Sequence, residues 1–244
     1  MSFASRLAAR NGTNLRSFCI DHFLPFQGVV DGDEETLRRV AALARVDTEA
    51  LRNTALVKAG QLRWTYRGIE LHRTVLRRER IALCPACSLA DIEANPGLRP
   101  NAAIHGRAAW LLDPLHTCPL HGIPLFLVPK DPTSRRTHDF AHHASVAVPS
   151  LAHLAASSVP RDLGSLEIYA LSRLAGTAAS PLLDPMPLAA AVSQRRTAAA
   201  SKPSPPDRTP SAACSTSWSK PKGRASATTV PAQPSADCSR SSAQ

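Results

Sequence analysis

Two pairs of potential metal ligands stand out in the sequence, Cys84-Pro-Ala-Cys87 and Cys118-Pro-Leu-His121. Both pairs have the same internal spacing, at which a tight turn lets two side chains reach one ion. Three thiolates and one imidazole complete a closed tetrahedron, which is typical of structural zinc, because a catalytic zinc keeps one position open for water. The pattern therefore predicts one structural Zn²⁺ ion, whose binding energy stabilises the fold.

The residues around the two pairs favour the turns and the packing that such a site needs. A proline follows the first cysteine of each pair, and Gly122 follows the histidine, as expected for tight turns. Thirty residues separate the pairs, so the spacer must hold structure of its own. Its candidate is the short apolar segment 106–112, in which Trp110 can pack against the ligand turns. The apolar segment 123–129 is expected to close the zinc module.

The arrangement of these motifs resembles the TniQ family, the target-selection adaptors of a large group of bacterial transposons. The resemblance rests on residues 83–87 (LCPAC), on Trp110 and on residues 115–125 (LHTCPLHGIPL). Residues 2–12 (SFASRLAARNG) are similar to the opening signature of that family. Together these motifs cover about residues 1–130.

The resemblance implies an adaptor rather than an enzyme. TniQ-like proteins are expected to recognise a target site, directly or through a partner complex, and to recruit the transposon's AAA+ ATPase, which engages the transposase. Double-stranded DNA, the ATPase and the transposase complex are then the implied partners. The sequence agrees, since it contains no G-x-x-x-x-G-K-[ST] loop, no nucleophile elbow and no HExxH pair.

The first 60 residues have helical patterns. Apolar spacing predicts helices at 3–9 and at 15–26, the second of them stopped by the proline near its end. A third helix begins at Asp33, with acidic residues in its first turn and basic ones later, which suits the helix dipole. Asp47 is expected to cap a fourth helix.

The third and fourth helices, joined by a tight turn, form either a DNA-reading helix-turn-helix or an ordinary helical hairpin. In the first case the fourth helix enters the major groove. That helix offers only Arg52, Asn53 and Lys58 as donors to DNA, and Glu49 opposes phosphate contact. Both interpretations remain open.

Positive charge concentrates just before the zinc ligands. Alternating apolar residues predict a short strand-like segment over 61–70. Six arginines fall within eighteen residues and are accompanied by only two glutamates. They are Arg63, Arg67, Arg73, Arg77, Arg78 and Arg80. Interleaved with Trp64 and Tyr66, they predict contacts to DNA phosphates, which position a protein without reading the sequence. The alternative is a solvated face of an arginine-rich protein.

The C-terminal part changes character along its length. Residues 131–190 are expected to form a helical extension, with helices near 151–155 and 163–174. From Gln194 onward, eight basic residues stand against two acidic ones among Pro, Ser and Ala. This composition predicts a disordered basic tail over 191–244. Such a tail either holds DNA electrostatically or is the product of a frameshifted reading frame.

These patterns predict a mainly α-helical protein with a small zinc-ribbon (α+β) module. The expected parts are a helical region with a hairpin or helix-turn-helix (1–60), a zinc-ribbon TniQ-like module (61–130), a helical extension (131–190) and the tail (191–244). Aromatic residues make up only 5% of the chain, so the core is modest and a metal ion that stabilises the fold becomes important.

The expected function is that of a DNA-associated adaptor for transposition. A cytoplasmic, nucleoid-associated location is expected, because no apolar run approaches the roughly 20 residues of a membrane span and no secretory signal begins the sequence. Two alternatives stay open. One is a zinc-stabilised protein-interaction module without direct DNA binding. The other is a degenerate fragment of a transposon protein, since the family places more residues before the serine that matches Ser5, which would make Met1 an internal start.

Overall fold

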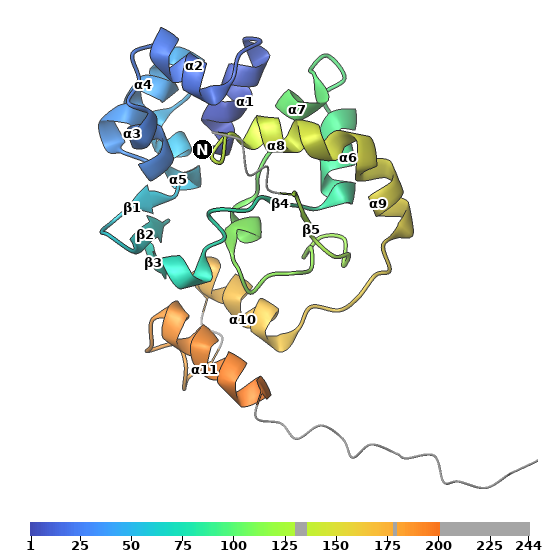
Figure 1. Ribbon diagram of the computed structural model, residues 1–244. Coiled ribbons are helices and arrows are strands. Elements are labelled where there is room, and N and C mark those ends of the chain that lie inside the picture. Colours follow the sequence, from blue (N-terminus) through green and yellow to red (C-terminus); the bar gives the residue numbers. More distant parts are fainter. Residues whose placement is uncertain (130–135, 178–179, 201–244) are drawn as a thin grey trace, which may run out of the picture. The chain divides into compact units, whose positions relative to one another are not determined.

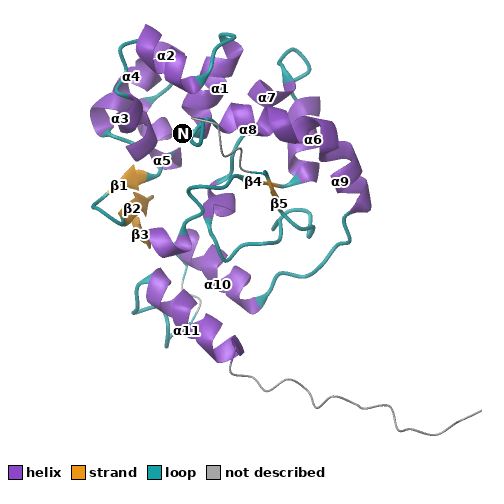
Figure 2. Cartoon of the chain, in the orientation of Figure 1, coloured by secondary structure: helices purple, strands orange, loops and turns teal. Residues whose placement is uncertain are grey.

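The chain is mainly helical and carries small antiparallel sheets (Figures 1 and 2), as expected from the sequence. The structure is a computed structural model, and it describes residues 1–129, 136–177 and 180–200. The ribbon begins with a group of helices, passes through the strands and ends in helices again. No helix within the described ranges is long and apolar enough to cross a membrane.

Five helices form the N-terminal region. They are α1 (Ser2–Arg10), α2 (Leu15–Asp21), α3 (Phe26–Asp31), α4 (Glu34–Ala44) and α5 (Thr48–Thr54). The side chains of Asn14, Asp33 and Asp47 accept hydrogen bonds from backbone N–H groups in the first turns of α2, α4 and α5. Each such cap stabilises its helix by about 1 kcal/mol. The helix starts predicted at Asp33 and Asp47 are thereby confirmed as the starts of α4 and α5.

The single helix predicted over 15–26 is wrong, because the chain forms α2 and α3 there. After α2 the backbone of Phe23 takes a positive φ of 53°. Pro25 is then the N-cap of α3, and proline disfavours a helical conformation in the residue before it. The same proline therefore separates two helices, and α3 ends at Gly32, whose φ of 71° suits glycine.

The segment predicted as one strand over 61–70 is part of a three-stranded antiparallel sheet. Its strands are β1 (Val57–Lys58), β2 (Arg63–Tyr66) and β3 (Ile69–His72), in the order β1-β2-β3. Arg67 and Gly68 form the turn between β2 and β3, with φ values of 50° and 79°. Two consecutive positive φ values characterise the hairpin turns whose twist matches that of the strands. Trp64 lies opposite Leu71, and both are buried.

Short elements frame the ligand pairs. They are η1 (Arg73–Val75), β4 (Ala82–Leu83), α6 (Pro85–Glu93), α7 (Pro100–Ala103), η2 (Ala108–Leu111) and β5 (Phe126–Leu127). β5 pairs antiparallel with β4. The segment after the second ligand pair therefore returns to the strand that precedes the first pair. This is the closure of the module that the apolar residues 123–129 predict.

Helices follow in the C-terminal part. They are α8 (Phe140–Ala147), η3 (Val148–Ser150), α9 (Leu151–Ser157), α10 (Ser165–Leu174) and α11 (Leu188–Ala200). The predicted helices near 151–155 and 163–174 correspond to α9 and α10. The predicted start of the tail at residue 191 is wrong, because α11 continues to Ala200 and buries Ala191 and Val192. The first residues of the predicted tail are rich in alanine, the strongest helix former, and therefore continue the helix. Residues 201–244 lie outside the described part.

Buried apolar side chains gather in two main clusters in the described part of the chain. One cluster lies within the helical region and includes Leu15, Phe18 and Val40. The other extends from Trp64 to Val192 and contains the cysteines of both ligand pairs. Helix α9 packs along α6 (Figure 1). The helical extension therefore shares its core with the ligand module.

Candidate metal centre

The first ligand pair sits at the junction of a strand and a helix. Cys84 directly follows β4 and is the N-cap of α6, where its sulfur accepts a hydrogen bond from the backbone N–H of Cys87 at 3.5 Å. Pro85 occupies the first helical position, which needs no N–H donor. The pair therefore lies on a helix N-terminus and not on the expected tight turn. The positive end of the helix dipole favours thiolates at this place.

The second ligand pair lies on a tight turn, as predicted. The backbone N–H of Cys118 donates to the carbonyl of Ile123 at 2.8 Å, and that of Gly122 donates to the carbonyl of Cys118 at 2.9 Å. Gly122 has a φ of 63°, a conformation in which a side chain would be strained. The turn directs both side chains of the pair toward the start of α6.

The four predicted ligands meet in one cluster, with all donor atoms within 4.8 Å of one another. The Nδ1 atom of His121 lies 3.6, 3.2 and 3.7 Å from the sulfurs of Cys84, Cys87 and Cys118, and the last two sulfurs are 3.7 Å apart. Sulfurs about 2.3 Å from a tetrahedral zinc lie about 3.8 Å from each other. The cluster is thus compatible with a metal ion at its centre. The cysteines are buried and the histidine is exposed.

Hydrogen bonds between the cysteine side chains shift their pKa values in opposite directions. The sulfurs of Cys87 and Cys118 lie 3.7 Å apart, within hydrogen-bonding distance, and side-chain hydrogen bonds with Cys84 and then Cys87 lower the pKa of Cys118. The same contact with Cys118 raises the pKa of Cys87. A cation at the centre favours the deprotonated form of all three cysteines, because metal ligands are thiolates. Three sulfurs and one imidazole form a donor set that suits Zn²⁺.

An ion pair fixes the spacer against α6. Asp91, a buried residue of α6, receives two hydrogen bonds from the guanidinium of Arg107, at 2.9 and 3.0 Å. Arg107 also stacks over Trp110 at 4.7 Å. Trp110 is 3% exposed and belongs to the same apolar cluster as the three cysteine ligands. The tryptophan is thus buried in the same core as the ligand cysteines, whereas Asp91 did not stand out in the sequence.

Hydrogen bonds from α10 and from the segment before it hold the two residues that precede the second ligand pair. Glu167 accepts hydrogen bonds from the backbone N–H groups of His116 and Thr117, at 2.8 and 2.7 Å. Arg161 donates to the hydroxyl of Thr117 at 2.8 Å and to the carbonyl of His116 at 2.9 Å. Sequence reasoning missed both residues as parts of the site. Their only local signal is the start of a helix near Gly164.

Arg77, predicted to contact DNA, is instead a buried structural residue. The residue is 7% exposed, and its guanidinium donates to the carbonyls of Trp110, Asp113 and Leu115 at 2.9 to 3.1 Å. These acceptors precede the second ligand pair. Arg77 therefore holds the spacer in place, and it is left out of the candidate DNA surface.

Most of the other predicted DNA-contacting residues lie at the surface in ion pairs. Arg52 pairs with Glu49, Lys58 with Asp31, Arg63 with Glu70, and Arg73 with Glu79. Arg67 donates to the carbonyl of Asn53 at 3.1 Å, so the hairpin turn touches the end of α5. Arg80 is exposed, whereas Arg78 stacks over Trp64 at 4.7 Å. Exposed ion pairs contribute only about 0–1 kcal/mol, so they do not prevent contacts to another anion.

Together, the fold and the cluster define a mainly helical protein organised around a closed set of three cysteines and one histidine. The TniQ family model matches residues 1–125, and the chain therefore belongs to the TniQ family. This confirms the resemblance seen in the sequence. Membership implies a transposition-associated adaptor role in a family of adaptors rather than enzymes. No curated protein and no solved structure matches the chain.

Proposed function

We propose that this protein is a DNA-associated adaptor that helps select the target site of a transposon and recruits its AAA+ ATPase. The ATPase then engages the transposase complex. The observation that carries the proposal is the convergence of four ligand atoms within the part of the chain that matches the family. A nucleoid-associated location would follow from DNA binding.

One Zn²⁺ ion held by Cys84, Cys87, Cys118 and His121 is the proposed structural cofactor. With all four positions occupied by protein, the ion has no place for substrate and acts on the fold alone. It joins the start of α6 to the turn before β5. A zinc-ribbon description applies only in the looser sense of a two-stranded sheet beside the ligands, because the first pair lies on a helix.

The proposed DNA surface combines the hairpin with the helical pair α4 and α5. Its exposed cations are Arg52, Lys58, Arg63, Arg67, Arg73 and Arg80. The hydrogen bond from Arg67 to the end of α5 supports this grouping, since it places the hairpin turn beside the helical pair. Phosphate contacts of this kind position a protein on duplex DNA. The helical pair would act as a helix-turn-helix, although α5 is only seven residues long.

A second candidate function is protein docking without direct DNA contact. It is favoured by the carboxylates that accompany the cations, because Glu49, Glu70 and Glu79 each pair with a predicted DNA-contacting arginine. In this case the metal module presents a surface to the ATPase alone. The parts of the chain proposed from the sequence, 1–60, 61–130, 131–190 and the tail, are compatible with either function.

Salt-dependent binding to duplex DNA separates the two functions. Phosphate contacts release counterions, so the logarithm of the binding constant falls with the logarithm of salt concentration by about 0.9 per contact. We expect the full chain to bind a mixed-sequence duplex with a slope of several units. We also expect the combined change of Arg63, Arg73 and Arg80 to Gln to reduce that slope by about 2 to 3 units.

A matched control removes three exposed arginines outside the hairpin, α4 and α5, namely Arg10, Arg99 and Arg136, also by change to Gln. It alters the net charge equally and is expected to leave most of the slope intact. Equal losses in both variants would show that only net charge matters. Absence of any binding at low salt would favour the docking function.

A further inference from the structure

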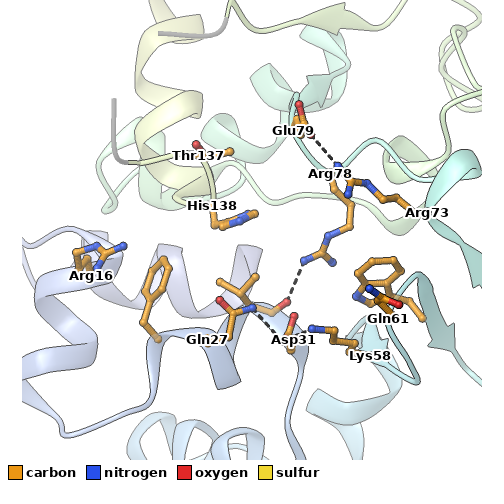
Figure 3. Close-up of a pocket in the computed structure, with 13 residues that line it drawn as sticks. Arg16, Gln27, Asp31, Lys58, Gln61, Arg73, Arg78, Glu79, Thr137 and His138 are labelled. Atoms are coloured by element: carbon orange, nitrogen blue, oxygen red, sulfur yellow. Dashed lines mark hydrogen bonds and ion pairs between the residues drawn. The ribbon is translucent and has the colours of Figure 1, made fainter. Parts of the chain in front are cut away.

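A pocket of about 830 Å³ lies beside the candidate DNA surface (Figure 3). Its walls come from α2 and α3, from the hairpin, from the segment between η1 and β4, and from residues 137 and 138 before α8. Segments distant in sequence thus converge on one space. A volume of this size accommodates a small ligand or part of a larger one.

The charged side chains of this pocket leave an excess of positive charge. Its two carboxylates are already engaged, because Asp31 pairs with Lys58 at 3.1 Å and Glu79 with Arg73 at 3.0 Å. Two further guanidiniums line the pocket, those of Arg16 and Arg78. Within the described residues, neither has a carboxylate within 4.0 Å. The pocket therefore suits an anion.

Arg78 carries a donor without an acceptor. Its guanidinium stacks over Trp64 at 4.7 Å, and its Nη2 atom makes only a long hydrogen bond of 3.4 Å to the carbonyl of Val30. The other terminal nitrogen, Nη1, is buried and has no hydrogen-bond partner in the described structure. An unsatisfied buried donor is costly, and more so when it is charged. Burial accordingly lowers the pKa of Arg78.

Two neighbouring rings repeat this pattern. His138 and Trp64 line the same pocket, and the Nδ1 atom of His138 and the Nε1 atom of Trp64 are buried and also lack hydrogen-bond partners within the described part. Figure 3 shows the imidazole of His138 and the guanidinium of Arg78 pointing toward the same central space. Burial first, and then the charge of Arg78, lowers the pKa of His138. The imidazole is therefore neutral near pH 7, and its Nδ1 can carry the proton that an anion would accept.

We propose that this pocket binds a phosphate group through Arg78 and His138, with Arg16 adding charge at its edge. A phosphate offers several acceptor oxygens, which donors from different directions can share, and a guanidinium matches it in geometry. Arg78 is half-buried, and a rotation of its guanidinium that brings Nη1 to a ligand oxygen costs only the long hydrogen bond to the carbonyl of Val30. The bound anion supplies the acceptor that these donors lack.

Two sources offer this chemistry, the backbone of duplex DNA and a free phosphate compound. The first source rests on the proposed function, since Arg73 and Arg78 were both predicted to contact DNA. The second source is independent of DNA binding. The experiment therefore uses both probes on the same protein.

The test titrates inorganic phosphate, and separately a short duplex, into the zinc-loaded full chain. The readouts are the NMR signals of the Trp64 indole N–H and of the His138 ring, with chloride at equal ionic strength as the reference. We expect a saturable shift with phosphate and a rise in the pKa of His138, because an adjacent anion favours the protonated ring. The changes Arg78→Gln and His138→Gln are each expected to weaken phosphate binding about tenfold, and Arg38→Gln to leave it unchanged.

Competition between the probes identifies the source. Displacement of phosphate by the duplex supports a backbone phosphate in the pocket. Phosphate binding without displacement supports a free phosphate compound, whether or not DNA binds elsewhere. If neither probe shifts the two rings, the pocket proposal is overturned, while salt-dependent DNA binding still decides the proposed function separately. Should Arg78→Gln not fold, as judged by thermal unfolding, Arg78→Lys and His138→Gln decide the outcome.

Discussion

The carboxylate of Glu167 accepts a hydrogen bond from the backbone N–H of Thr117 at 2.7 Å, across fifty residues of sequence. Thr117 directly precedes the ligand Cys118. The contact joins α10 to the turn that carries the second ligand pair, and hydrogen bonds from His116 and Gly164 complete it. A helix outside the family match thus supports the candidate metal centre.

Replacement of Glu167 should loosen this support in a pH-dependent manner. Burial raises the pKa of Glu167, but the hydrogen bonds from Gly164, His116 and Thr117 outweigh it and lower the pKa overall. A lowered pKa in the folded state means that the ionised form stabilises the fold above the unfolded pKa of about 4.3, and that this stabilisation is lost as the pH falls through the folded value.

We therefore expect Glu167→Gln to lower the free energy of unfolding by about 1–3 kcal/mol at pH 7, with a smaller difference from the wild type below about pH 4. Urea unfolding at several pH values measures the difference. Glu49→Gln, at an exposed position of α5, is the control and should change little. A difference for Glu167→Gln that does not vary with pH would contradict the role of its charge.

Arg77 should matter for stability and not for DNA. Because its guanidinium donates to three carbonyls in a buried position, the change Arg77→Met leaves these acceptors unsatisfied and is expected to cost about 2–4 kcal/mol. Arg80→Gln, at an exposed position of the same segment, should cost less than about 0.5 kcal/mol. If the Arg77→Met variant were as stable as the wild type and bound DNA with a smaller salt dependence, Arg77 would contact DNA after all, as the sequence predicted.

The hairpin turn depends on a glycine. Gly68 has a φ of 79° and open space around its Cα, so Gly68→Ala is destabilising through backbone strain alone, by about 1 kcal/mol. Gly97 also has open space but no positive φ, and Gly97→Ala should be neutral or stabilising. Thermal unfolding of both variants compares them. Equal effects would argue against the turn conformation described above.

Helix α11 should contribute to the core. Val192 is 2% exposed, and truncation of a buried apolar side chain leaves a cavity. The change Val192→Ala is expected to lower the free energy of unfolding by about 1–3 kcal/mol, whereas Gln194→Ala at an exposed position should not. If Val192→Ala were as stable as the wild type, residues 191–200 would belong to a tail, as the composition had suggested.

The sequence predicted best what depends on short spacing. The two candidate ligand pairs, the helix starts near Asp33 and at Asp47 and the turn at Gly122 were each predicted from residues within a few positions of one another. The zinc-ribbon form was not confirmed, because the spacing of Cys84 and Cys87 fits a helix start as well as a turn.

Long-range contacts could not be predicted in this way. The burial of Arg77 depends on carbonyls more than thirty residues away, and its charge suggested exposure. The hydrogen bonding by Arg161 and Glu167 likewise depends on tertiary packing alone. Sequence pattern and composition do not predict such contacts, since each of these charged residues is equally compatible with an exposed position on the surface.

The metal content of the purified full chain tests the central claim most directly. Mass spectrometry of the metal bound to the protein should find one zinc per chain, and the double change Cys84→Ser and Cys118→Ser should abolish it. Cys19→Ser, a change at a buried cysteine outside the cluster, should leave it at one. Because zinc binding is coupled to folding, chelation should also lower the unfolding temperature of the wild type. A folded chain without zinc, or with zinc retained in the double variant, would contradict the account.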